Sequence, residues 1–206
     1  MSHDFPVKVD TLHIGEAPQK IVFYPRIRGI RNRIFEKRLN DLIVKAVQTL
    51  IDTQVGNMPT TITEMLGTYE IKNNQREVLS LLLSNYTFHH QAAHGMTYLK
   101  SLTFDLQKEK LCTLADLFKP GSPYVDRIST LIKEQIEKRG ISLLNEFTQI
   151  KPDQDFYIAD KTLVIYFQLY DITPYAFGFP MFPVSVYDLI DIIEENGPLG
   201  RLATNR

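Results

Sequence analysis

Three of the five histidines, His89, His90 and His94, lie within six residues of each other. Neutral imidazole is the commonest metal ligand in proteins, so this cluster is the first candidate for chemistry. On a β-strand, however, His89 and His90 point to opposite faces, and His90 and His94 would share a face only on a helix. Three interpretations stay open: a metal site, a turn histidine that hydrogen-bonds the local backbone, and a residue that contacts a ligand.

The same cluster permits an alternative function, a metal-dependent hydrolase or deacetylase-like enzyme that uses His89 to His94. In peptidoglycan and chitin deacetylases, two histidines at this spacing follow an aspartate in a Thr-Phe-Asp-Asp-Gly motif. Here Thr103-Phe104-Asp105 is followed by Leu106 and comes after the histidines. Both departures remove the expected base and ligand order, so the match is interpreted as chance.

Other catalytic patterns are missing from the sequence. It has no Gly-x-Ser-x-Gly elbow and no glycine-rich phosphate loop. Cys112 is the only cysteine, which excludes an internal disulfide and a four-thiolate metal site. We expect Cys112 to be a small buried apolar residue beside Leu111 and Leu114. The sequence therefore predicts a protein that is not an enzyme, with no catalytic residue, no metal and no cofactor.

The overall composition is that of a globular domain. The chain has 206 residues, of which 44% are hydrophobic, and 23 basic against 24 acidic residues give a net charge of -1. Such a balance does not favour nucleic acid as a partner. No apolar run approaches the roughly 20 residues of a membrane span, and no secretory leader is evident. As the sequence stands, we expect a cytoplasmic protein; its oligomeric state is open.

The candidate residues must be positioned by a β-rich first half. Alternating apolar residues predict strands over residues 78–89 and 96–105, joined by a turn at 91–95. A third strand over residues 60–71, followed by a polar turn at 72–75, completes an antiparallel meander. Apolar residues at three- and four-residue spacing predict a helix from Arg33 to Gln54 with Asn32 as its N-cap, and we expect its stripe to pack on the meander.

The second half combines helices and strands, so the fold class is α+β with antiparallel sheets and two main amphipathic helices. We expect a helix after Ser122-Pro123 and ending at Gly140, then strands over 156–158 and 163–170, helical spacing over 185–193, and a loose polar tail from 197 to 206. We place the boundary between two subdomains that share a core or interface at 118/119, giving 1–118 and 119–206.

An aromatic loop over residues 173–183 is the best candidate for recognition. It carries Pro174, Tyr175, Phe177 and Phe179 between turn-forming residues, and two further prolines stiffen it. The rings either plug the end of a sheet or form an exposed binding surface. For the second case, the predicted partner-binding residues are those four together with His94 and Gly95 of the turn.

Several short motifs, in this order, carry a family resemblance: Tyr24-Pro25-Arg26-Ile27-Arg28-Gly29, Ala92-Ala93-His94-Gly95, Leu114-Ala115-Asp116-Leu117-Phe118, Phe156-Tyr157-Ile158 and Tyr170 to Gly178. With them the chain resembles a tandem pair of domains of unknown function, found in the extracytoplasmic part of the anti-sigma-V factor and the N-terminal part of peptidoglycan deacetylase C. The resemblance implies an α+β fold without catalytic residues, an extracytoplasmic setting, and a protein (lysozyme-like) or cell-wall glycan partner.

Overall fold

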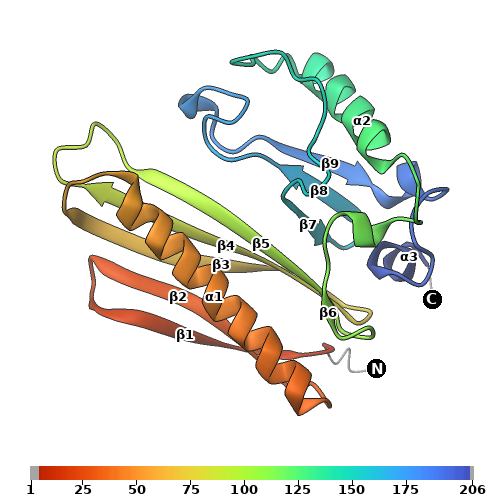
Figure 1. Cartoon of the computed structure of the whole chain (residues 1–206), viewed down its shortest axis with the longest axis horizontal. Coiled ribbons are helices and arrows are strands. Elements are labelled where there is room, and N and C mark those ends of the chain that lie inside the picture. The colour runs from red at the N-terminus through yellow and green to blue at the C-terminus, as the bar shows by residue number, and fades with distance from the viewer. Residues whose placement is uncertain (1–4, 205–206) are drawn as a thin grey trace.

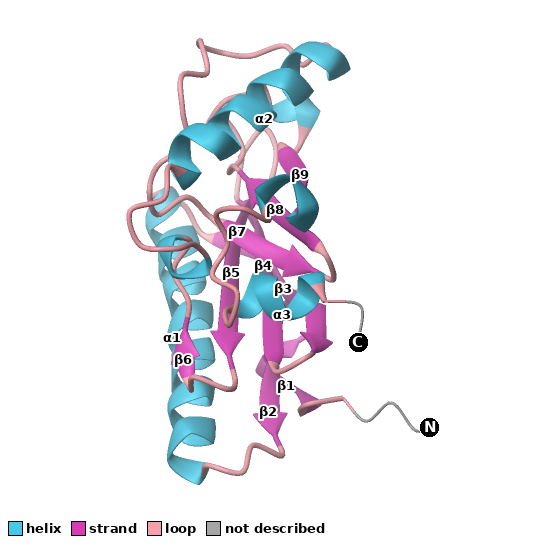
Figure 2. Cartoon of the chain, turned by 90° about the vertical axis from the view of Figure 1, so that its right-hand side faces the viewer, coloured by secondary structure: helices cyan, strands magenta, loops and turns pink. Residues whose placement is uncertain are grey.

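The computed structural model describes residues 5–204, which form four layers (Figures 1 and 2). The first half contains β1 (Lys8–Ala17), β2 (Lys20–Arg28), α1 (Arg33–Asn57), β3 (Ile62–Gln75), β4 (Val78–His89), β5 (Met96–Asp105) and β6 (Lys110–Leu111). The second half contains α2 (Tyr124–Arg139), β7 (Phe156–Ala159), β8 (Thr162–Tyr166), β9 (Met181–Ser185), α3 (Pro198–Ala203) and three short 3-10 turns. The predicted α+β class is confirmed.

The larger sheet has the order β1-β2-β3-β4-β5-β6. Its strands are antiparallel except β2 and β3, which are parallel because α1 makes the crossover between them. The predicted meander of β3, β4 and β5 is confirmed. The turn expected at residues 72–75 is wrong: these residues continue β3, and the turn is formed by Arg76 and Glu77 alone, at φ of 52° and 57°. Neither is the Gly or Asn that usually marks such a turn, which is why composition misplaced it.

The helix α1 covers one face of this sheet (Figure 1). The Asn32 side chain accepts hydrogen bonds from the amides of Ile34 and Phe35, so the predicted N-cap is confirmed. The buried apolar residues of α1 pack on the meander strands β4 and β5. On the helix they are Phe35, Leu39, Ile43, Ala46, Val47 and Leu50, and on the strands they are Leu79, Leu81, Leu83, Leu102 and Phe104. Ile34, an apolar residue at the start of the predicted helix, is 83% exposed because it lies in the first turn on the solvent side of α1.

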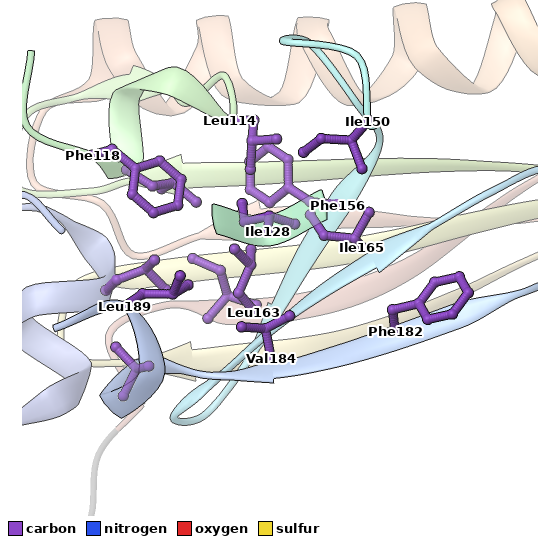
Figure 3. Close-up of a cluster of buried hydrophobic side chains, with 14 of the residues drawn as sticks. Leu114, Phe118, Ile128, Ile150, Phe156, Leu163, Ile165, Phe182, Val184 and Leu189 are labelled. Carbon is purple, nitrogen blue, oxygen red and sulfur yellow. The ribbon is translucent and has the colours of Figure 1, made fainter. Parts of the chain in front are cut away.

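The second sheet, β7-β8-β9, lies against the other face of the larger sheet, and β8 is its central strand. Successive side chains of its strands point to opposite faces of this second sheet, so they enter two different hydrophobic cores. Tyr157, Val164 and Tyr166 face Leu82 and Leu99 of the larger sheet. On the opposite face, Phe156, Ile158, Leu163, Ile165, Phe182 and Val184 pack with α2 (Figure 3).

The segment before α2 joins the same core as the second sheet. Leu114, Leu117 and Phe118 pack with residues of α2 and β8, and Phe118 makes an isolated antiparallel bridge to Ile193. Helix α2 begins at Tyr124 with Pro123 as N-cap and ends at Gly140, which adopts the left-handed conformation at φ 59°. The division into subdomains at residue 118 stays a prediction.

The C-terminal stretch is more ordered than the sequence suggests. Instead of a loose tail, α3 buries Leu199 and Leu202, and residues 205–206 lie outside the described residues. The Arg201 guanidinium binds the fully buried Asp105 carboxylate at 2.8 Å and donates to the carbonyl oxygens of Arg76 and Glu77. The C-terminal residues look like a polar tail in the sequence because only two leucines of α3 pack in the core, and the ion pair between Arg201 and Asp105 also holds the helix.

Candidate functional site

The turn between β4 and β5 meets the loop between β8 and β9 at one end of the molecule. Tyr175 donates a hydrogen bond from its hydroxyl to the Gly95 carbonyl oxygen at 2.9 Å. Its ring lies 4.2 Å from the His94 ring, centroid to centroid, and 5.5 Å from the Tyr170 ring. Two segments about 80 residues apart in the sequence are thereby joined by three neighbouring rings, tilted by 31° to 36° to one another.

His94 is fixed on both nitrogens. Its Nδ1 lies 2.9 Å from the Gly95 carbonyl oxygen, which can only accept, so Nδ1 carries the proton of the neutral ring. Nε2 is then the acceptor for the Tyr170 hydroxyl at 3.2 Å. These two bonds set both the tautomer and the orientation of the ring.

Gly95 allows this turn to pack closely. A Cβ at this position would overlap the ring of Tyr86 on β4, so Tyr86 lies directly against the glycine backbone. Burial raises the pKa of the Tyr86 hydroxyl, and the nearby Glu64 carboxylate and Tyr175 add to the rise. The turn therefore has a rigid support beneath it.

The loop from β8 to β9 is ordered by local turns. Pro174, at φ -57°, precedes a single 3-10 turn over Tyr175–Phe177, and Gly178 closes it at φ 79°. Phe177 is 42% exposed and Pro174 is exposed. Phe179 instead packs, half buried, on the cluster between the two sheets. The loop thus supplies both a plug, through Phe179, and an exposed surface.

Tyr170 belongs to the site although it is not among the predicted partner-binding residues. The expected strand over 163–170 ends at Tyr166, and Asp171 then accepts a hydrogen bond from the Gln168 amide to form a turn. Tyr170 stands in this turn at φ 67°, a left-handed conformation that is uncommon for a bulky side chain, and is 47% exposed. A polar Gln168 and an Asp171 flanking the tyrosine are the only signals for this turn in the sequence.

We define the aromatic patch as His94, Tyr170, Tyr175 and Phe177. A hollow of about 250 Å³ is lined in part by Asp171 and Ile172, which follow Tyr170 in the sequence. Its walls combine Phe147 and Phe167 with polar and charged residues: Asn145, Glu146, Thr148, Gln149, Lys151 and Gln154. None of the four patch residues lines this hollow.

The structure separates the histidine cluster. His89 is buried under α1, and its two ring nitrogens lie 3.0 Å and 3.1 Å from the carbonyl oxygens of Thr60 and Gln54. His90 is exposed, and His94 belongs to the aromatic patch. Within residues 5–204, no group of three or more His, Cys, Asp or Glu side chains is arranged to hold a metal ion.

Cys112 is buried, as expected. Burial raises the pKa of its thiol to about 11, with a further contribution from Asp105. A thiol of this kind is a poor nucleophile near neutral pH, because the thiolate is the reactive form. Among the described helices, none is long and apolar enough to cross a bilayer.

Comparison with known proteins matches residues 115–187 to a family described as a protein of unknown function, DUF3298. Peptidoglycan-N-acetylmuramic acid deacetylase PdaC of Bacillus subtilis is 23% identical over 197 residues. That alignment covers 92% of this chain but only 42% of the relative, so the chain spans less than half of PdaC.

Two solved structures share the fold. A DUF3298 family member from Bacteroides fragilis has a TM-score of 0.71 at 13% identity and covers 97% of this chain and 98% of its own. A DUF3298 family protein from Pseudomonas aeruginosa has a TM-score of 0.67 at 15% identity and covers 98% of both chains. Part of the chain, residues 115–187, therefore matches the DUF3298 family of unknown function, the chain as a whole shares the fold of two DUF3298 proteins, and its sequence is related to part of the deacetylase PdaC.

Proposed function

We propose that the chain is a non-enzymatic recognition domain that binds a cell-wall glycan through the aromatic patch. A sugar ring would stack on Tyr170 and Tyr175, and its hydroxyl and acetamido groups would reach the polar hollow beside Asp171. Phe177 and Pro174 would extend the contact along the loop.

The observation that carries this proposal is the conformation of Tyr170. Residues held in sparsely populated backbone regions cost of the order of 1–3 kcal/mol and concentrate at binding sites. Here the strained residue is a tyrosine that is 47% exposed, and its ring lies 5.5 Å from the Tyr175 ring at a tilt of 32°. The backbone strain therefore positions a ring at the surface instead of filling the core.

The rigidity of the patch also supports binding. Hydrogen bonds to Gly95 and His94 hold the two tyrosines in place before a partner arrives. A preorganised surface loses less conformational entropy on binding than a flexible loop does. Aromatic rings with polar groups around them are typical of sites that bind polar ligands with apolar faces.

The surroundings of His89, His94 and Cys112 favour a binding function over a catalytic one. The nitrogens of His89 face backbone carbonyls, His94 is engaged by Tyr170, and the Cys112 thiol is buried with a raised pKa. A cell-wall partner requires the domain to act outside the membrane, which is the setting that the family resemblance implies, and not in the cytoplasm.

Calorimetric titration with purified soluble muropeptides tests the proposal, and a parallel titration with lysozyme tests the protein partner that the resemblance implies. We expect muropeptide binding that weakens at least tenfold, equivalent to ~1.4 kcal/mol, in the double variant Tyr170→Ala/Phe177→Ala. Both side chains are exposed, so the fold should tolerate the change.

The matched control is Tyr187→Ala, because Tyr187 is 49% exposed but lies on the 3-10 turn Val186–Leu189, outside the patch. The Tyr187→Ala variant should bind muropeptide with the affinity of the wild type. Binding of lysozyme alone, with the same loss in the double variant, would replace the glycan by a protein partner. Absence of binding to both, or equal binding by the control and the double variant, would overturn the proposal.

A further inference from the structure

The end of β2 and the first turns of α1 carry a positive charge that the chain as a whole lacks. Residues 26–38 contain six arginine and lysine residues against one acidic residue, whereas the whole chain has a net charge of -1. We define the basic end as these six residues, all of which are exposed: Arg26, Arg28, Arg31, Arg33, Lys37 and Arg38.

Neighbouring carboxylates neutralise only half of the basic end. Three of the six cations form ion pairs at distances of 2.6 Å, 2.9 Å and 2.8 Å: Arg28 with Asp10, Arg33 with Glu36, and Lys37 with Asp41. Within residues 5–204, no carboxylate pairs with Arg26, Arg31 or Arg38. Glu109 also reaches this end, where it accepts a hydrogen bond from the Asn32 side chain at 2.7 Å. Three guanidinium groups are therefore left without a counter-charge, and the amide dipoles at the N-terminus of α1 add to their field.

A groove of about 360 Å³ between β2 and α1 brings cations of both elements together. Arg26 lines it from β2, and Arg33 and Lys37 line it from α1. Both carboxylates that line the groove, Glu36 and Asp41, are the ones already paired with these two helix cations. The remaining lining includes four apolar or aromatic residues: Leu12, Tyr24, Pro25 and Val44. Cations beside apolar walls suit a phosphate ester that carries hydrocarbon chains.

Ile34 is an exposed apolar residue in the middle of the basic end. It is 83% exposed, and helical spacing places Lys37 and Arg38 beside it on the same face of α1. In water this side chain contributes nothing to the core, whereas at a bilayer interface it would enter the acyl boundary. Positive charge alone would suit any polyanion, nucleic acid included. Ile34 and the apolar groove walls favour a lipid surface instead.

We propose that the basic end docks the protein on the surface of a membrane that contains anionic phospholipid. The three unpaired arginines would lie at the lipid phosphate groups, and Ile34 would lie at the boundary of the acyl chains. Each arginine or lysine close to such a surface adds to the binding free energy, and salt screens the contribution.

Docking at this end would hold the aromatic patch away from the bilayer. Helix α1 has 25 residues, so it extends ~38 Å from the basic end to Asn57 (Figure 1). Near that far end, the Gln54 side chain donates to the Met96 carbonyl oxygen at 2.9 Å, next to Gly95 of the β4–β5 turn. This orientation toward the cell wall rests on the proposed function, whereas the docking itself does not.

Cosedimentation with unilamellar vesicles tests the docking. The protein should bind vesicles of equal parts phosphatidylglycerol and phosphatidylcholine but not vesicles of phosphatidylcholine alone. Raising the salt to ~1 M, where the Debye length is only ~3 Å, should release it. The partition coefficient should fall at least tenfold in the double variant Arg26→Glu/Arg38→Glu and in Ile34→Asp. All three positions are exposed, so the variants should fold like the wild type.

Lys133→Glu/Lys138→Glu is the matched control, because it changes the net charge equally at exposed positions of α2, far from the first turns of α1 (Figures 1 and 2). It should bind the anionic vesicles like the wild type. The proposal is refuted if the wild type does not bind these vesicles, if the control loses as much binding as Arg26→Glu/Arg38→Glu, or if Ile34→Asp binds like the wild type.

Two further probes separate the membrane from other sources of phosphate. Inorganic phosphate, added at constant ionic strength, should not displace the protein from the vesicles, and displacement would assign the basic end to a free phosphate. Duplex DNA, followed by fluorescence anisotropy, should bind more weakly than the vesicles. Tighter binding of DNA, unchanged by Ile34→Asp, would replace the membrane by nucleic acid.

Discussion

Replacing Arg201 by Met removes the cation that neutralises a carboxylate in the interior. The Asp105 side chain is fully buried, and Arg201 binds it through two nitrogens, at 2.8 Å and 3.2 Å. Removing one partner of a buried ion pair costs ~3–5 kcal/mol, because the other charge stays buried without compensation. The amides of Gln107 and Lys108 still donate to Asp105, which places the expected loss near the lower limit, ~3 kcal/mol.

Urea unfolding followed by circular dichroism measures this loss. With a slope of ~2–3 kcal/mol per molar urea for a chain of this size, the midpoint should fall by about 1 M or more. Arg127→Met is the matched control, since Arg127 pairs with Asp191 at 2.9 Å on the surface, with side chains 40% and 58% exposed. Exposed ion pairs contribute ~0–1 kcal/mol to the free energy of unfolding, so Arg127→Met should lower the urea midpoint far less than Arg201→Met does.

Neutralising the partner as well should restore part of the stability. The double variant Asp105→Asn/Arg201→Met carries no unpaired buried charge, so it should be more stable than Arg201→Met alone. Equal midpoints for Arg201→Met and Arg127→Met would refute the account of how α3 is held.

Three further predictions concern the core and its charges. Val47→Asp should lower the free energy of unfolding by several kcal/mol because Val47, on the buried face of α1, is 3% exposed, whereas Ile34→Asp, at an 83% exposed position, should change it by less than ~1 kcal/mol in the same urea assay. The Cys112 thiol should react with dithionitrobenzoate only after denaturation, since it is buried and its pKa is raised to about 11; rapid reaction of the native protein would contradict this. Burial acts to raise the pKa of Asp116, but hydrogen bonds from Lys110 and Thr113 outweigh it and lower the pKa. The stabilisation by the Asp116 carboxylate is therefore present above the unfolded pKa of ~4 and is lost as pH falls through the lower folded pKa. Asp116→Asn should cost ~1 kcal/mol or less at pH 7, and equilibrium unfolding should show that this cost shrinks as the pH falls below ~4.

The meander and α1 could be predicted because their signals are local and periodic. The apolar stripe of α1 runs from Phe35 to Leu50, which is about four turns, and the side chain of Asn32 caps the helix. The alternating strands β4 and β5 are flanked by a recognisable turn. Such elements depend little on partners distant in the sequence.

The elements that were misplaced depend on distant contacts. The Arg76-Glu77 turn lacks Gly or Asn and is held by Arg201, more than 120 residues away. For the same reason α3 looks like a polar tail until its ion pair with Asp105 is seen. A pattern read along the chain does not contain these pairings.

The candidate site was partly predictable. The turn at His94 and the loop with Tyr175 and Phe177 were both identified from residue type, but nothing in the sequence says that the Tyr175 hydroxyl reaches Gly95. Tyr170 was assigned to a strand because the run before it is apolar. Its exposure results from a turn made by Gln168 and Asp171, which only the fold reveals.

Nuclear magnetic resonance mapping of a muropeptide complex tests the central claim most directly. With uniformly ¹⁵N-labelled protein, saturating muropeptide should shift amide resonances in residues 92–97 and 168–178, the two segments that form the aromatic patch. Amides of residues 68–75 of β3, at the far end of β4 from the patch, should keep their positions. Shifts confined to residues 68–75 or spread elsewhere, or a spectrum unchanged at millimolar muropeptide, would contradict recognition of a glycan by the aromatic patch.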